Sequence, residues 1–132
     1  MTDYVVDTDV ISFFLRHDSR AEPYRPYLEG VRPVISFMTL AEIQYGAARA
    51  GWGTTRTEQM LKHLQQCIVF HETVELCRIW AQLRAEVESG GRHLSPSDAW
   101  IAATAVLLDL PLLSHNRKDY ESVSSLSLIS FG

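Results

Sequence analysis

The chain has 132 residues, of which 46% are hydrophobic, and this length and composition suit one compact domain with its own core. Its 12 lysine and arginine residues and 16 aspartate and glutamate residues give a formal net charge of -4, which excludes the global basic field of many nucleic-acid-binding proteins. We therefore expect a single domain over residues 1–132, in which any contact with nucleic acid depends on local cations.

Short strands and helices alternate in the first half of the chain. Apolar and β-branched runs predict strands at residues 4–6, 34–36 and 68–70. Helical spacing of apolar residues predicts helices over 10–15, 39–50 and 55–66, and Gly51 ends the second of these. Three prolines, Pro23, Pro26 and Pro33, leave room only for a short helix or a pair of turns before the second strand.

The second half of the chain continues the same alternation. A helix over residues 72–88 is predicted from one apolar face. That face consists of Leu76, Ile79, Trp80, Leu83 and Val87. The clearest helix covers residues 96–108, with Ser95 as its N-cap and Pro96 at its first position, and strands follow at 112–114 and 126–129. Strands that alternate with helices predict an α/β fold, in which a short, mostly parallel central sheet carries helices on both faces.

The cysteines and the apolar segments indicate the cellular compartment of the protein. Cys67 and Cys77 lack the spacing of a metal site and are too few for a disulfide framework, so we expect buried thiols in a reducing compartment. The longest apolar stretch, residues 99–108, is too short to cross a membrane. The sequence therefore predicts a cytoplasmic protein without a membrane partner.

Four acidic residues occupy equivalent places in this pattern, because each follows a short apolar strand at or just inside the start of the next helix. They are Asp7, Glu42, Asp98 and Asp119. Each one alone can be explained as a helix cap or a first-turn acid, an arrangement worth about 0.5 to 1 kcal/mol. Capping does not require the four to gather, however, whereas a parallel sheet would bring them to its carboxyl edge.

Carboxylates that converge within a few ångströms repel one another unless a cation lies among them. Because the candidate ligands are oxygen atoms, without a cysteine or histidine cluster, Mg²⁺ or Mn²⁺ is favoured over Zn²⁺. Such sites hydrolyse phosphodiester bonds, in which the ion activates a water molecule and stabilises the leaving oxygen. The sequence therefore predicts a metal-dependent hydrolase of phosphodiesters.

Four segments of the chain resemble, in order and spacing, the four sequence blocks of PIN-domain toxins of the VapC type. These segments are residues 4–9 (YVVDTD), 36–46 (SFMTLAEIQYG), 94–104 (LSPSDAWIAAT) and 112–120 (LLSHNRKDY). The resemblance implies a Mg²⁺- or Mn²⁺-dependent endoribonuclease that cuts tRNA or rRNA. It also implies a homodimer and a cognate antitoxin of the VapB type that holds the enzyme inactive.

The resemblance also assigns roles to individual residues. Asp7 and Asp98 match the principal metal-binding aspartates of the family, and Glu42 matches the glutamate that completes the first acidic cluster. In the last block, Asn116 stands where some members have an aspartate, and Asp119 follows three residues later. We expect Asp119 to be the fourth acid and Asn116 to contact water or phosphate, although either residue can fill the fourth position.

Two other functions compete with the nuclease. The strand followed by Asp7, Thr8 and Asp9 also resembles the opening motif of haloacid-dehalogenase-type phosphatases, in which the first aspartate is the nucleophile. No lysine with a following acidic pair completes such a site, and the chain is short for that fold. The other alternative is a non-catalytic PIN-like binding module, for which a broken acidic set is expected.

Overall fold

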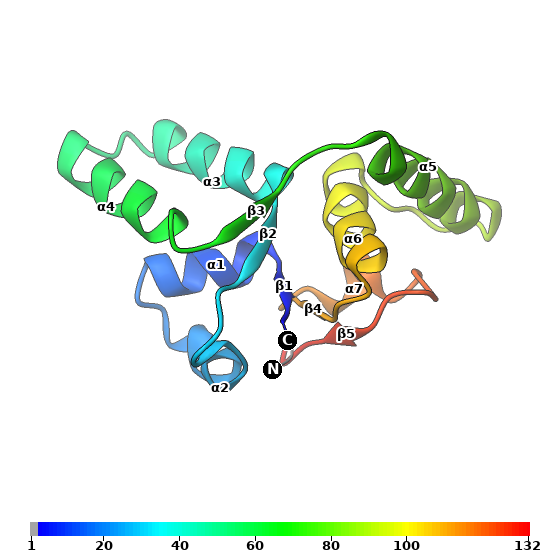
Figure 1. The fold of residues 1–132 in the computed structure, drawn as a ribbon, viewed down its shortest axis with the longest axis horizontal. Coiled ribbons are helices and arrows are strands. Elements are labelled where there is room, and N and C mark those ends of the chain that lie inside the picture. The colour runs from blue at the N-terminus through cyan, green and yellow to red at the C-terminus, as the bar shows by residue number, and fades with distance from the viewer. Residues whose placement is uncertain (1–2) are drawn as a thin grey trace.

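The computed structural model describes residues 3–132, so that Met1 and Thr2 of the predicted domain lie outside the described residues. Five strands form one sheet in the order β3-β2-β1-β4-β5, and every neighbouring pair is parallel (Figure 1). The strands are β1 (Val5–Val6), β2 (Val34–Ser36), β3 (Ile68–Phe70), β4 (Leu112–Leu113) and β5 (Leu128–Ile129). Each strand was predicted from the sequence, and a fully parallel sheet confirms the expected α/β class.

Helices connect the strands. In chain order they are α1 (Thr8–Leu15), the 3-10 helix η1 (Ser19–Tyr24), α2 (Arg25–Leu28), α3 (Phe37–Arg49), α4 (Thr54–Leu64), α5 (Val74–Ser89), α6 (Pro96–Leu108) and α7 (Arg117–Tyr120). The proline-rich segment, for which a short helix or a pair of turns was predicted, forms two short helices, η1 and α2. Helix α6 has the predicted bounds, because the Ser95 hydroxyl caps it and Pro96 fits its first position.

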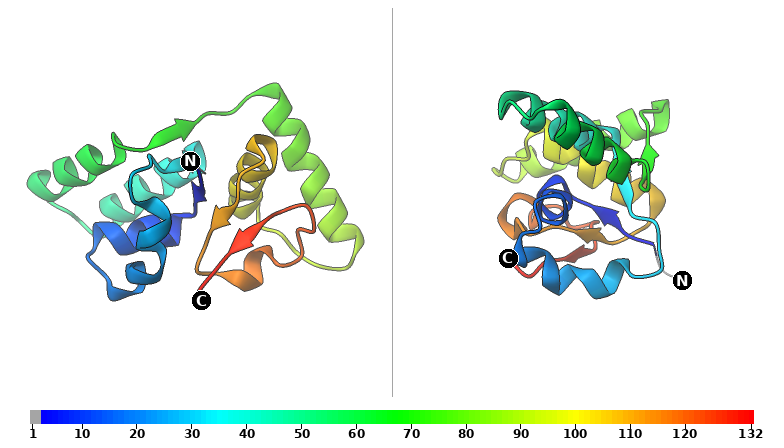
Figure 2. Two further views of the ribbon diagram at one scale, coloured as in Figure 1. Left: turned by 60° about the horizontal axis from the view of Figure 1, so that its bottom comes forward. Right: turned by 90° about the vertical axis from the view of Figure 1, so that its left-hand side faces the viewer.

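The side chains of each strand alternate between two separate cores. Val5 and Leu112 pack with α5 and α6 on one face of the sheet. Their neighbours Val6 and Leu113 pack with α1, α3 and α4 on the other face. Successive residues of a strand point to opposite faces, so even a two-residue strand contributes to both cores. Figures 1 and 2 show the result, with α1 to α4 on one side of the strands and α5 and α6 on the other.

Helix α3 begins two residues earlier than the predicted start at Thr39. Ser36 ends β2 and is also the N-cap of α3, because its hydroxyl accepts a hydrogen bond from the Met38 amide at 3.0 Å. One residue therefore ends the strand and starts the helix, with no loop between them. As a consequence, Glu42 lies in the second turn of α3 and cannot act as a first-turn cap.

Two further sequence expectations concern the cysteines and the membrane. Cys67 is partly buried, but Cys77 is exposed on α5, so the expectation that both thiols are buried was wrong for Cys77. Cys77 falls outside the apolar face of α5, which explains its exposure. Among the described residues, no helix combines the length and the apolar character that crossing a bilayer requires.

Candidate active site

Asp7 lies at the carboxyl edge of the two central strands. The β1–β4 register pairs Val6 with Leu113, so the next residues, Asp7 and Ser114, are neighbours. The Ser114 hydroxyl donates a hydrogen bond to Asp7 Oδ2 at 2.8 Å, and the Thr8 amide donates to Asp7 Oδ1 at 2.7 Å. Asp7 is therefore the N-cap of α1, and it is only 6% exposed. The capping explanation holds for Asp7, but it does not explain why further carboxylates surround it.

Glu42 reaches the same edge from α3. The Thr8 hydroxyl donates to Glu42 Oε1 at 2.8 Å and lies 3.0 Å from the hydroxyl of Thr39. Because a hydroxyl group has one proton, Thr39 must be the donor to Thr8. Thr39 is fully buried, so this chain of hydrogen bonds fixes Glu42 beside the start of α1.

Asp98 enters from α6 and meets α7. Ser95 caps α6 by accepting from the Asp98 amide at 3.2 Å, and its hydroxyl is also within hydrogen-bonding reach of the Asp98 carboxylate. The Tyr120 hydroxyl donates to Asp98 Oδ1 at 3.2 Å. Asp119 lies close enough to Asp98 to raise its pKa, and the exposed Asn116 donates a hydrogen bond to Asp119. Asp119 is thus beside Asp98, whereas Asn116 is connected to Asp98 only indirectly, through its hydrogen bond to Asp119.

A fifth carboxylate, Asp9, completes the group. The His115 amide donates to Asp9 Oδ2 at 3.1 Å, and this bond holds Asp9 against the end of β4. The negative charge of Asp9 acts on Asp7, and that of Asp98 acts on Asp9. The structure therefore brings together all four acids that the sequence predicted and adds Asp9 to them.

Asp7, Asp9, Glu42 and Asp98 share one electrostatic signature, a raised pKa. Burial, followed by the negative charge of Asp9, raises the pKa of Asp7 to about 7. Burial is also the largest cause of the raised pKa values of Asp9, Glu42 and Asp98. None of the ion pairs found within residues 3–132 involves these acids. The carboxylates therefore form a desolvated cluster in which a cation would relieve their repulsion.

The sequence did not single out two of the groups that organise this cluster. Thr8 orients Glu42, and the buried phenol of Tyr120 contacts Asp98. Burial and the nearby carboxylates raise the pKa of Tyr120 far above its usual value, so its hydroxyl stays protonated and always donates. Both residues lie inside the sequence blocks that contain Asp7 and Asp119, and this position was the one feature of the sequence that could have indicated them. Their contacts depend on the folded chain.

The donor chemistry of the cluster suits a hard divalent cation. Within residues 3–132, no three acidic, histidine or cysteine side chains lie close enough together, in their present positions, to hold a metal ion. Instead, the hydroxyls of Thr8, Ser114 and Tyr120 each bind one carboxylate. Every such carboxylate keeps lone pairs that these hydrogen bonds do not use. The residues therefore fit Mg²⁺ or Mn²⁺, which take oxygen ligands.

Comparison with known proteins places the chain in a family. The model of the PIN domain family matches residues 4–125. The chain is 26% identical over 129 residues to Ribonuclease VapC1 of Haemophilus influenzae (93% of each chain) and 25% identical over 126 residues to the tRNA(fMet)-specific endonuclease VapC of Shigella flexneri (96% of each). Its fold matches that in the crystal structure of DNA-bound VapBC from Salmonella typhimurium, with a TM-score of 0.87 at 22% identity over the whole of both chains. The resemblance seen in the four sequence blocks is thus confirmed, and the chain belongs to the PIN domain family.

Proposed function

We propose that this chain is a Mg²⁺- or Mn²⁺-dependent endoribonuclease, the toxin of a type II toxin–antitoxin pair. The observation that carries the proposal is the placement of Asp7, Glu42, Asp98 and Asp119 at one edge of the sheet, where burial raises the pKa values of the first three and where none of the four forms an ion pair within residues 3–132. The ribonuclease names of the VapC relatives support the class of enzyme. Family membership favours this function over the phosphatase, and the complete acidic set favours it over a non-catalytic module.

Each residue of the cluster has a specific role in this proposal. Asp7, Asp98 and Glu42 would hold the ion, which when bound activates a water molecule and stabilises the leaving oxygen. Ser114 and Thr8 keep Asp7 and Glu42 in place through their hydroxyl groups. Hydrogen bonds of this kind orient metal ligands and fix the position of their lone pairs.

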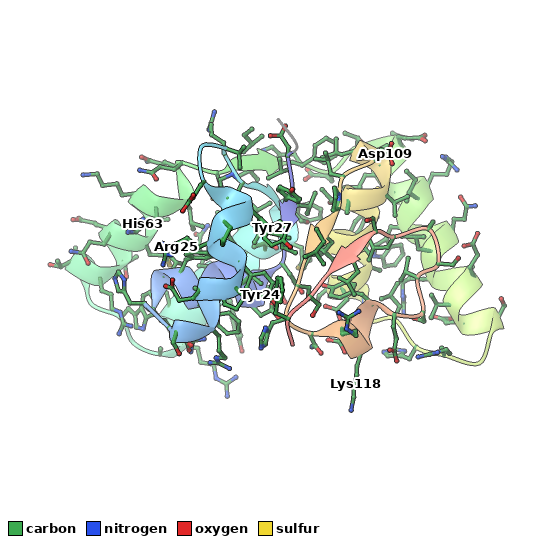
Figure 3. The ribbon with its side chains drawn as sticks, turned by 90° about the horizontal axis from the view of Figure 1, so that it is seen from below. Tyr24, Arg25, Tyr27, His63, Asp109 and Lys118 are labelled. Atoms are coloured by element: carbon green, nitrogen blue, oxygen red, sulfur yellow. The ribbon has the colours of Figure 1, made fainter. Side chains whose placement is uncertain are left out.

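The substrate we propose is tRNA or rRNA in the cytoplasm, with tRNA first because one relative is named as a tRNA endonuclease. A protein with a net charge of -4 needs local cations to hold phosphates. Lys118 is exposed on α7 next to Asp119, and Figure 3 shows its side chain extending away from the body of the protein. It is therefore placed to contact a phosphate beside the scissile bond.

The test of the function is cleavage of total tRNA and rRNA fragments by the purified protein. We expect discrete cuts with Mg²⁺ or Mn²⁺ and none with EDTA. An Asp98→Asn variant, prepared in the same way, serves to exclude a contaminating nuclease, because it should give no cuts. Cleavage that persists in EDTA or in this variant would refute the proposed site.

The fourth position of the acidic set gives a separate prediction. Asp119→Asn is expected to slow cleavage about tenfold to a hundredfold, because Asp119 lies beside Asp98 and is half-buried. Asn116→Ala is expected to slow it less than tenfold, because Asn116 is exposed and acts through Asp119. Initial cleavage rates at saturating metal decide between them, and a larger loss in Asn116→Ala would reverse the assignment.

A VapB-type antitoxin is the proposed protein partner. A cavity of about 430 Å³ opens between α1, α2 and α4. Phe14, Leu15 and Leu28 supply apolar surface to it, and Arg25 and His63 lie at its polar positions (Figure 3). An amphipathic segment of the antitoxin could fill such a cavity, and the inhibited complex is expected to retain the acidic cluster unchanged.

We also propose that the chain forms a homodimer through the side of the sheet that ends in β3. Three large apolar side chains are exposed there, namely Leu61 at 39%, Ile68 at 42% and Val74 at 89%. Because β3 is an edge strand, pairing or packing with a second copy would cover it. Light scattering is expected to give twice the 15.0 kDa chain mass. The Ile68→Lys variant is expected to be a monomer, and an unchanged dimer would place the interface elsewhere.

A further inference from the structure

Tyr120 is a buried aromatic residue whose polar end reaches the acidic cluster. Its side chain is only 1% exposed and belongs to the apolar core between the sheet and α5 and α6. A phenylalanine would fill the same space and cover the same apolar surface. The hydroxyl group therefore needs an explanation other than packing.

The partners of that hydroxyl are carboxylates from two different parts of the chain. It donates a hydrogen bond to Asp98 Oδ1 at 3.2 Å. It is also within hydrogen-bonding reach of Asp7, at the junction of β1 and α1. A single O–H group on α7 thus lies between the two aspartates that are the principal candidates to hold the metal.

We propose that Tyr120 is a positioning residue, whose hydroxyl holds Asp98 next to Asp7 in the arrangement that receives the divalent ion. This inference rests on the proposed function. Two buried carboxylates repel each other, so without a donor between them the Asp98 side chain would turn toward solvent. The hydrogen bond from Tyr120 uses Oδ1 of Asp98, so this contact does not occupy Oδ2.

Asp98 depends on this support more than Asp7 does. Both carboxylate oxygens of Asp7 accept hydrogen bonds from its immediate surroundings, Thr8 and Ser114. Asp98 lies on the first turn of α6, where its amide donates to the Ser95 cap and its carboxylate is also within hydrogen-bonding reach of the Ser95 hydroxyl. Ser95 belongs to the start of the same helix, so Tyr120 on α7 is the donor that ties the Asp98 carboxylate to another element.

Tyr24 offers a matched control. It is also fully buried, but it packs in the opposite core, and Figure 3 shows it on η1. Its hydroxyl accepts from the Phe131 amide at 2.9 Å and lies 2.8 Å from His115 Nδ1 and 3.3 Å from the Ser114 carbonyl oxygen, so its partners within residues 3–132 include no carboxylate. Tyr24→Phe and Tyr120→Phe each remove one buried hydroxyl, so they should destabilise the protein similarly.

The experiment compares Mg²⁺ and Mn²⁺ binding by calorimetry in the wild type, Tyr120→Phe and Tyr24→Phe, with thermal denaturation in EDTA as the measure of stability. Tyr120→Phe is expected to weaken metal binding about tenfold, the usual size of effect for a group that orients a ligand. Saturating metal should restore most of kcat in Tyr120→Phe, with the KM for RNA unchanged. Tyr24→Phe should bind metal within about twofold of the wild type.

Two outcomes would overturn the positioning role. Equal affinity in Tyr120→Phe and the wild type would reduce Tyr120 to a core residue. Tighter binding in Tyr120→Phe would show that the hydroxyl competes with the ion. A wild type that binds neither metal would instead refute the metal dependence of the proposed function, and the role of Tyr120 with it, so the two failures are distinguishable.

Discussion

Asp7→Asn is expected to abolish RNA cleavage and, at the same time, to stabilise the metal-free protein. Burial and Asp9 raise the pKa of Asp7 to about 7, so above that pH the folded protein keeps an unfavourable buried charge. The rise in the pKa of Asp7 from 3.8 to about 7 corresponds to about 4 kcal/mol, of which asparagine should recover roughly 2 to 4 kcal/mol. Asparagine is as good an N-cap as aspartate, so α1 keeps its cap. Loss of a metal ligand should slow cleavage by at least about a thousandfold.

Urea unfolding at pH 8 in EDTA and initial cleavage rates in Mg²⁺ measure the two effects. The control is Asp109→Asn, the same substitution at an exposed residue with a left-handed backbone that asparagine tolerates well (Figure 3). It should change neither quantity. If Asp7 is only a helix cap, Asp7→Asn should leave cleavage unchanged, and that result would contradict the site.

The stability of the metal-free protein is expected to fall as the pH rises from 4 to 8. Folding raises the pKa of Asp7 from 3.8 to about 7, so between these values the folded state binds more protons than the unfolded state. The stability that the protonated form contributes is complete below pH 3.8 and is lost as the pH passes through 7. The raised pKa values of Asp9, Glu42 and Asp98 act in the same direction.

Metal should reverse this trend, because it binds the ionised carboxylates. At a hundredfold excess over the dissociation constant, Mg²⁺ should stabilise the protein at pH 8 by about 2.7 kcal/mol. Melting temperatures across this pH range, with Mg²⁺ or with EDTA, measure the effect. Asp7→Asn should flatten the EDTA profile, and a wild-type profile in EDTA that rises toward pH 8 would show that the cluster is not strained by its own charge.

Local signals decided how much of the fold could be predicted. Helix α6 was predicted to the residue because Ser95 and Pro96 are strong start signals. The start of α3 was missed because Ser36 belongs to both a strand and a helix, which a pattern of apolar residues does not reveal. The parallel sheet followed from the alternation of elements, since parallel strands need a crossover connection.

The candidate site also contains residues that the sequence could predict and contacts that only the folded structure shows. Asp7, Glu42 and Asp98 could be predicted because each occupies a fixed place in a recognisable sequence block. The contact of Tyr120 with Asp98 joins α7 to the start of α6 across 22 positions, and no local pattern encodes it. The preference for Asp119 over Asn116 at the fourth position stays a prediction, and its structural support is the closeness of Asp119 to Asp98.

A crystal structure of the protein with Mn²⁺, with the ion located by its anomalous scattering, tests the proposed metal site. We expect a peak at the carboxyl edge of the sheet, bound by oxygen atoms of Asp7 and Asp98 and close to Glu42. A peak elsewhere, or an acidic cluster without one at saturating Mn²⁺, would contradict it.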